Sequence, residues 1–231
     1  MTFQEEDYET RDADPYALAK FEIVKSWLPP APCTILDAGS GNGFFAAELA
    51  KRGYAVTALD PNKKACAMAV GRKKRFGLKH MTVVQADFYK YTPKTKFDAV
   101  IALDVLEHVT SEREFVSHVA RVLKPRGVWV LTVPALQVLY GRFDELLEHR
   151  ERYDMGKIRR AAADTFSIKK MRYFGMSFIP LAVVTKLRKT TYPVEQGSKG
   201  LLGVAMRAVC ALEREFPAPL GTSLLAKLQL R

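Results

Sequence analysis

The chain has 231 residues, 48% of them apolar and 26% charged, which is enough for one packed domain with additions. Its three cysteines lie far apart and form no C-x-x-C pair, which excludes a zinc or redox site of that kind, and we expect no metal. The N-terminus is acidic and polar, unlike a secretory signal, and no window is apolar enough to span a bilayer, so we expect a cytoplasmic protein.

The net charge of +11 is unevenly distributed along the chain. Residues 1–149 hold 20 Lys and Arg against 19 Asp and Glu, whereas residues 150–231 hold 16 against 6. A basic last third suggests an acidic partner, such as nucleic acid, an anionic lipid surface or a phosphorylated substrate. The charge alone leaves open the alternative of a solvated basic face.

Strand and helix signals alternate along the first 134 residues. Apolar, β-branched runs predict strands at 33–39, 54–60, 81–87, 96–104 and 128–134. Helical spacing, turn residues and a Ser111–Glu114 capping box predict helices at 42–53, 61–76 and 111–123. Strands that alternate with helices in this way predict right-handed crossovers and an α/β fold with a doubly wound parallel sheet.

Three glycines, Gly39, Gly41 and Gly43, follow the first predicted strand. Ligands of doubly wound sheets bind beyond the carboxyl ends of the strands, and glycines there let a ligand approach the backbone and the next helix N-terminus. Asp60 ends the second strand, where a carboxylate can accept both ribose hydroxyls. This pattern predicts a ligand that contains adenosine.

The residues around the glycines argue against a dinucleotide. The fingerprint G-x-G-x-x-G/A needs a small residue at position 44, where this chain has Phe44. Asp37 in the first strand and Asp87 at the end of the third add negative charge, which repels a diphosphate but suits a sulfonium and an ammonium group. The charge pattern favours S-adenosylmethionine.

The chain resembles the class I S-adenosylmethionine-dependent methyltransferases over residues 34–135. The motifs that carry the resemblance occur in the family's order: ILDAGSGNGFFAAELA, VTALDPN, VVQADF, FDAVIALDVLEHV and LKPRGVWVLTVPA. The resemblance implies one domain over 1–231 with a Rossmann-like, seven-stranded, mostly parallel sheet. Residues 164–174 and 221–231 would be the sixth and seventh strands, the last one antiparallel.

The resemblance also implies which residues bind the cofactor. They lie at or after the ends of the first four strands: Gly39, Gly41, Gly43 and Asp37 at the methionine and ribose, Asp60 at the ribose hydroxyls, Asp87 at the adenine amino group, Pro61 and Phe88 at the adenine faces, and Leu103 and Asp104 at the methionine end. One aspartate at a strand end is commonly only a turn cap, but three at successive strand ends are better explained by a ligand.

Residues 136–163 form the expected substrate side, because they follow the fifth strand. Together with the end of that strand they resemble a P-A…D…H-x-R-R-Y pattern of bacterial methyltransferases often found near glycan or lipid biosynthesis genes, with HRERY in place of H-x-R-R-Y. Methyl transfer from a sulfonium mainly needs alignment, but a hydroxyl acceptor benefits from a base. The catalytic candidates are His149, His108 and Tyr153, and the substrate-binding candidates are Tyr140 and Arg152. A salt-bridge network on a surface helix is the alternative.

Residues 175–220 are longer than the link that the family needs between its last two strands. They hold an apolar run at 175–185, basic residues at 186–192 and a predicted helix at 198–216. We expect a helical accessory insert that packs on the body of the protein or makes peripheral contact with an anionic membrane.

These patterns together predict O-methylation of a small-molecule, glycan or lipid-linked acceptor. One alternative is an RNA methyltransferase that uses the basic last third, although the chain lacks the Asp/Asn-Pro-Pro-aromatic turn of enzymes that methylate exocyclic amines. A second is an NAD(P)-dependent oxidoreductase with Tyr153 and Lys157 as its catalytic pair. A third is a non-catalytic protein that keeps the cofactor pocket.

Overall fold

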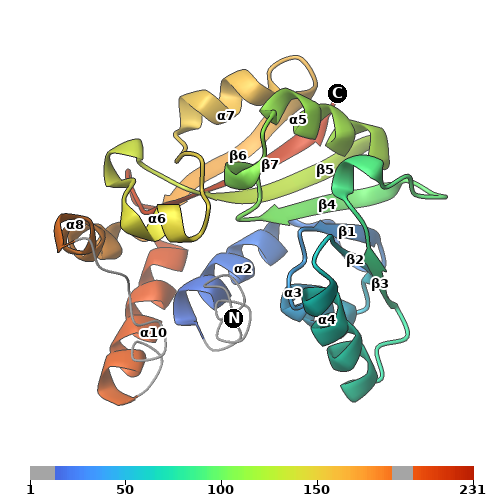
Figure 1. Cartoon of the computed structure of the whole chain (residues 1–231), viewed down its shortest axis with the longest axis horizontal. Coiled ribbons are helices and arrows are strands. Elements are labelled where there is room, and N and C mark those ends of the chain that lie inside the picture. The colour runs from blue at the N-terminus through green and yellow to red at the C-terminus, as the bar shows by residue number, and fades with distance from the viewer. Residues whose placement is uncertain (1–13, 189–199) are drawn as a thin grey trace.

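The computed structural model of the chain describes residues 14–188 and 200–231, and its central element is a seven-stranded sheet (Figure 1). The strand order is β3-β2-β1-β4-β5-β7-β6. The strands are β1 (Thr34–Ala38), β2 (Ala55–Asp60), β3 (Met81–Gln85), β4 (Phe97–Leu103), β5 (Leu123–Pro134), β6 (Phe166–Phe174) and β7 (Ser223–Leu230). β1 to β5 pair in parallel, and β7 is antiparallel to both β5 and β6, which confirms the predicted fold class.

Helices cover both faces of this sheet (Figure 1). They are α2 (Pro15–Trp27), α3 (Phe44–Ala50), α4 (Lys63–Arg75), α5 (Glu112–Val122), α6 (Arg142–Leu146), α7 (Met155–Ala162), α8 (Ile179–Arg188) and α10 (Gly200–Glu215). Short 3-10 turns are η2 (Phe88–Lys90), η3 (Leu106–His108), η4 (Gln137–Leu139) and η5 (Met176–Phe178). None of the described helices is long and apolar enough to cross a bilayer.

The first two helices after the glycines differ slightly from the sequence prediction. α4 begins at Lys63 because the Asn62 side chain accepts hydrogen bonds from the backbone N–H of Lys64 and Ala65, at 2.9 and 3.1 Å, so Pro61 lies before the cap. α3 ends at Ala50, and Gly53 follows in the left-handed region that allows the chain to turn into β2.

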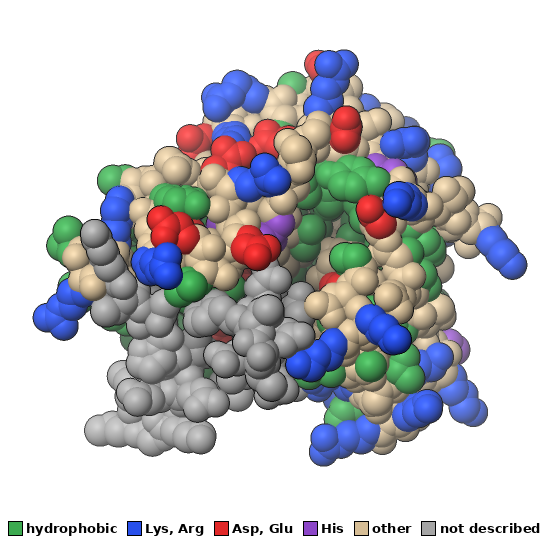
Figure 2. Space-filling view, viewed as in Figure 1, with side chains coloured by type: hydrophobic (Ala, Val, Ile, Leu, Met, Phe, Trp, Pro, Cys, Tyr) green, Lys and Arg blue, Asp and Glu red, His purple; other side chains and the backbone are tan. Residues whose placement is uncertain are grey.

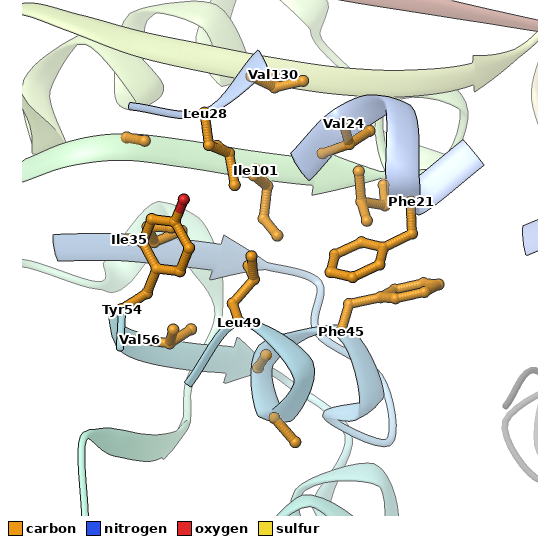
Figure 3. Packing of buried hydrophobic residues seen from close by; sticks show 14 of the residues in the cluster. Phe21, Val24, Leu28, Ile35, Phe45, Leu49, Tyr54, Val56, Ile101 and Val130 are labelled. Atoms are coloured by element: carbon orange, nitrogen blue, oxygen red, sulfur yellow. The ribbon is translucent and has the colours of Figure 1, made fainter. Parts of the chain in front are cut away.

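Helix α2 has no counterpart in the sequence prediction. Its Phe21 ring stacks on Phe45 of α3, with 4.5 Å between ring centroids, and Val24 packs toward Ile101 of β4 and Val130 of β5 (Figure 3). α10 packs against the same helix. α2 is therefore covered on two sides, which explains why no simple amphipathic stripe marks it in the sequence.

Candidate functional site

The turn after β1 is tied to the end of β2 by backbone hydrogen bonds. The N–H groups of Gly39 and Ser40 donate to the carbonyl oxygen of Leu59 at 2.8 and 3.0 Å. Gly39, Gly41 and Gly43 have φ values of +76°, +52° and +71°. Residues with a Cβ atom rarely adopt this region, so the turn requires its glycines.

Two of these glycines also permit close packing. A Cβ on Gly39 would lie 2.6 Å from Cγ2 of Val105, and one on Gly43 would lie 2.6 Å from Cβ of Ala69 in α4. Gly43 is the N-cap of α3, so its lack of a side chain sets the distance between α3 and α4. The Phe44 ring lies under the Arg72 guanidinium, 5.3 Å from the ring centroid.

Replacing Gly43 with alanine should lower the free energy of unfolding by about 1–3 kcal/mol, because of both the left-handed backbone and the overlap with Ala69. The double variant Gly43→Ala, Ala69→Gly removes the 2.6 Å contact with Cβ of residue 69, but it keeps the backbone strain and the 3.1 Å contacts with Cα of residue 69 and Cε of Met81, so it should recover part of the loss. Urea unfolding of both variants and of Ala69→Gly measures this. Equal stability of Gly43→Ala and the unchanged chain would contradict the packing role.

Asp60 ends β2 and connects the glycine turn to the start of α4. Its Oδ2 accepts the Gly41 N–H and its Oδ1 accepts the Asn62 N–H, both at 2.8 Å. The residue is 4% exposed, and burial raises the pKa of its carboxyl, partly offset by the two N–H donors. Each carboxylate oxygen can accept a further hydrogen bond, so Asp60 keeps capacity for a pair of hydroxyls.

The remaining cofactor candidates on β1 and β3 differ in exposure. Asp37 is 2% exposed within β1, whereas Asp87 is exposed and accepts the Tyr89 N–H at 2.8 Å. The Phe88 ring is buried against Phe115 of α5, with centroids 4.8 Å apart. Pro61, the other residue expected at an adenine face, is exposed beside the end of β2.

Asp104 follows β4 directly and is held by charged and polar partners. Lys20 of α2 contacts both carboxylate oxygens, at 2.7 and 3.0 Å, and the Thr132 hydroxyl donates to Oδ1 at 2.8 Å. The side chains of Lys20 and Asp104 are only 10% and 20% exposed. Leu103 and Asp104 line a small cavity with Ala17, Lys20, Phe21, Phe45 and Thr132.

Lys20 is a candidate site residue that the sequence analysis did not identify. A lysine inside an apolar helix is usually read as a solvated residue. Here its ammonium faces the carboxyl ends of β4 and β5 and pairs with the very aspartate assigned to the methionine end. Lys20 is the one charged residue among the buried residues of α2, whereas Glu22 and Lys25 of the same helix are not buried.

The predicted substrate segment is organised around Asp144 of α6, which is fully buried. Its carboxylate accepts hydrogen bonds from His149 Nδ1 at 2.9 Å, from Arg152 Nε and Nη2 at 2.8 and 2.9 Å, and from the Gly141 N–H at 3.0 Å. Burial alone would raise the pKa of Asp144, but these donors lower it below its usual value. The carboxylate is therefore ionised and orients the imidazole.

Three side chains meet where this segment contacts η3. Glu107 and His108 come from η3 and His149 from the loop after α6, and their donor atoms all lie within 4.8 Å of one another. The imidazoles of His108 and His149 form an edge contact with centroids 4.9 Å apart. The structure thus brings the two catalytic histidine candidates together, and His108 lies on the turn that follows Asp104.

The other predicted residues of this segment contact backbone groups. The Tyr140 hydroxyl donates to the His149 carbonyl at 2.7 Å, and Arg152 Nη1 donates to the Ala135 carbonyl at 3.2 Å. The Tyr153 hydroxyl donates to the Leu106 carbonyl at 3.1 Å, the residue is 1% exposed, and burial raises its pKa. Lys157 pairs with Glu112 and Glu151, so Tyr153 and Lys157 do not form an open oxidoreductase pair.

Comparisons with known proteins identify the family of the central part of the chain. A family model described as a methyltransferase domain matches residues 36–131. The chain is 35% identical over 98 residues to ubiquinone biosynthesis O-methyltransferase of Rickettsia prowazekii (strain Madrid E). The aligned region spans 42% of this chain and 38% of that protein. Residues 36–131 are a class I S-adenosylmethionine-dependent methyltransferase domain. The chain matches only about two fifths of the length of this curated relative.

Solved structures extend the likeness of the methyltransferase fold to nearly the whole chain. Phosphoethanolamine N-methyltransferase 2 of Haemonchus contortus, solved with S-adenosyl-L-methionine, has a TM-score of 0.64 at 18% identity and covers 90% of this chain and 51% of its own. A chain from the complex of the Haloferax volcanii Trm112 methyltransferase activator with a methyltransferase has a TM-score of 0.69 at 15% identity. The match covers 99% of this chain and 98% of that one. S-adenosylmethionine is the cofactor that the family and this fold support.

Proposed function

We propose that the protein transfers a methyl group from S-adenosylmethionine to a hydroxyl oxygen of a small molecule. The observation that carries the proposal is the position of two groups at one edge of the sheet. The glycine turn, Asp60 and Asp104 lie at the carboxyl ends of β1, β2 and β4, and the cluster of Glu107, His108 and His149 begins three residues after Asp104. The name of the O-methyltransferase relatives supports oxygen as the acceptor atom.

In this proposal the cofactor lies across the carboxyl ends of β1, β2, β3 and β4. Asp60 accepts the ribose hydroxyls and Asp87 the adenine amino group. Lys20 adds a contact for the methionine carboxylate, because its ammonium lies beside Asp104, which would take the methionine ammonium. The other proposed contacts are Gly39, Gly41, Gly43, Asp37, Pro61, Phe88 and Leu103.

The reaction needs one proton acceptor at the substrate side. The acceptor oxygen attacks the methyl carbon, the carbon–sulfur bond breaks, and the neutral thioether leaves with the electron pair. We assign the hydroxyl proton to His149 Nε2, because Asp144 holds Nδ1 and stabilises the imidazolium. Tyr140, Arg152 and Tyr153 then act by positioning this imidazole and its loop.

Replacing His149 with glutamine should lower kcat for a hydroxyl acceptor by about 10²- to 10⁴-fold and leave the affinity for S-adenosylhomocysteine unchanged, since only the proton acceptor is lost. Transfer of a radiolabelled methyl group to a panel of phenols and catechols measures kcat. The matched control is His80→Gln, which changes an exposed histidine between α4 and β3. A kcat equal to that of the control would contradict the assignment.

A lipid-linked or glycan-type acceptor at an anionic membrane surface is the finer part of the proposal. Apolar side chains of α8 are exposed beside Lys186 and Arg188, among them Leu187 at 76% and Leu181 at 45%. Figure 2 shows hydrophobic and basic side chains together at the left of the view, where α8 lies. Such an arrangement is typical of interfacial helices. The predicted basic residues 189–192 lie outside the described residues.

Vesicles that contain anionic phospholipid should retain the protein at low salt and release it at high salt. Leu187→Glu should abolish most of this retention, whereas Val70→Glu on α4 should not, because α4 lies at another part of the molecule (Figure 1). Cosedimentation measures the bound fraction. Absence of retention of the unchanged chain would overturn membrane contact without affecting methyl transfer.

A further inference from the structure

We propose that the outer side of α4 binds the phosphodiester backbone of a nucleic acid. Residues 61–80, which contain α4 and the chain at its two ends, hold seven Lys and Arg and no Asp or Glu. Figure 2 shows basic side chains gathered at the lower right of the view, where α4 lies. We call five of these cations the α4 surface: Lys63, Lys73, Lys74, Arg75 and Lys79.

The cations of the α4 surface are not neutralised within the described part of the chain. No carboxylate of residues 14–188 or 200–231 forms an ion pair with any of the five. The Arg75 guanidinium lies 5.3 Å from the centroid of the Phe76 ring, a contact that leaves its charge in place. By contrast, Lys51 and Arg52 nearby pair with Glu48. The fold therefore accounts for these neighbouring cations but not for the α4 surface.

The positions of the cations within α4 are unfavourable for the free protein. Lys63 and Lys64 occupy the first turn, which contains no acidic residue. The partial positive charge of a helix N-terminus disfavours cations there. The last turn, residues 72–75, holds four consecutive cations, and like charges three or four residues apart on a helix repel each other. Bound phosphates would relieve both kinds of repulsion.

The length and residue types of the α4 surface suit a chain of phosphates. The 13-residue helix is roughly 20 Å long and has cations in its first and last turns, so a strand that lies along it passes several of them. Lys and Arg both contact phosphates, whereas Lys is depleted in protein–protein interfaces. Four of the five cations are Lys, which favours a nucleic acid over an acidic protein.

The α4 surface suits a lipid bilayer less well than α8 does. Its exposed large apolar side chains are Val70 at 37% and Phe76 at 42%. An interfacial helix needs a continuous apolar face that enters the bilayer. The apolar side of α4 is instead buried, because Ala65, Cys66 and Ala69 pack inside the protein. The outer side is thus suited to phosphates rather than to acyl chains.

This nucleic-acid contact is independent of methyl transfer. None of the five cations is assigned to the cofactor or the acceptor, and α4 packs on the glycine turn through the buried Ala69. Substitutions on the α4 surface should therefore leave the affinity for S-adenosylhomocysteine unchanged. Circular dichroism reports the fold of each variant without any cofactor.

The test is fluorescence anisotropy of a labelled 20-nucleotide oligouridylate titrated with the full chain at several salt concentrations. We expect a Kd of about 10⁻⁶ to 10⁻⁴ M near physiological salt, and a slope of log affinity against log salt of roughly −3, as for four or five phosphate contacts. Lys63→Glu, Lys74→Glu should weaken binding at least about tenfold and reduce the slope by about 1 to 2. The matched control is Arg159→Glu, Arg160→Glu, which makes the same change of charge on α7, across the sheet from α4 (Figure 1).

The control variant should bind the oligouridylate within about threefold of the unchanged chain. Oligodeoxythymidylate of the same length distinguishes RNA from DNA as the source of the phosphates. Absence of binding at 50 mM salt, or equal weakening by the α4 and α7 variants, would overturn the α4 surface as a nucleic-acid site. Equal affinity for a 20-residue polyglutamate would overturn it in favour of an acidic protein. If the α4 variant does not fold, Lys74→Gln, Arg75→Gln decides in the same way.

Discussion

Replacing Asp60 with alanine should weaken binding of S-adenosylhomocysteine by roughly 30- to 1,000-fold, which corresponds to about 2–4 kcal/mol. Asp60 is buried, and its two oxygens are fixed by the Gly41 and Asn62 N–H groups with acceptor capacity left over. The variant loses both the proposed hydrogen bonds to the ribose hydroxyls and the hydrogen bond that Asp60 accepts from Gly41 of the glycine turn. Calorimetric titration measures the affinity.

The matched control for this experiment is Asp98→Asn. Asp98 lies near the amino-terminal end of β4, away from the carboxyl ends of the strands. There it pairs with Lys124 and accepts the Thr34 N–H. Its replacement should affect stability but leave affinity for the sulfur nucleoside unchanged. If Asp60→Ala bound as tightly as this control, the ribose site would have to lie elsewhere on the chain.

Replacing Lys20 with methionine should distinguish binding of the amino acid part of the cofactor from binding of its adenosine part. Affinity for S-adenosylhomocysteine should fall by about 10- to 100-fold, because a buried charge-assisted contact with the methionine carboxylate is lost. Affinity for 5′-methylthioadenosine, which has no amino acid part, should change by less than about threefold. The comparison of two ligands on one variant isolates the contact from general effects on folding.

Lys25→Met is the control on the same helix. Lys25 pairs with Glu22 near the end of α2, so its loss should affect neither ligand. Equal weakening of both ligands by Lys20→Met would mean that Lys20 only supports α2 and Asp104. Weakening confined to S-adenosylhomocysteine would place the methionine end between Lys20 and Asp104.

The sheet could be predicted from the sequence because each of its elements carries a local signal. The strands of residues 34–134 are apolar runs that end at glycine, aspartate or proline, and β7 alternates apolar and polar residues. α2 could not be recognised in this way. It is buried on one side by the sheet and on another by α10, and its one buried charge, Lys20, has a partner far away in sequence.

The glycine turn and the aspartates proposed to bind the cofactor could be located from the sequence for the same reason, whereas the proposed substrate side appeared in the sequence only as a set of residue types. His108 and His149 meet because Glu148, with a φ of +59°, turns the chain back after α6 toward η3. A left-handed glutamate leaves no reliable mark in a sequence. Nor does the sequence show that Arg152 and Tyr153 point into the segment and contact Asp144 and the Leu106 carbonyl.

The basic last third also has a partly internal explanation. Arg152 binds Asp144, and Arg172 of β6 donates to the carbonyl oxygens of Glu213 and Arg214 at the end of α10. These charges hold the accessory helix and the substrate segment in place. Part of the excess that suggested an acidic partner therefore serves the fold, and the charge of α8 is the part that supports a surface role.

The most direct test of the central claim is calorimetric titration of the full chain with S-adenosylmethionine and S-adenosylhomocysteine, with NADH and NADPH titrated in parallel. We predict binding of the two sulfur nucleosides alone, because the glycine turn, Asp60 and the Lys20–Asp104 pair suit an adenosine with a zwitterionic end. Binding of a nicotinamide nucleotide without the sulfur nucleosides would contradict it.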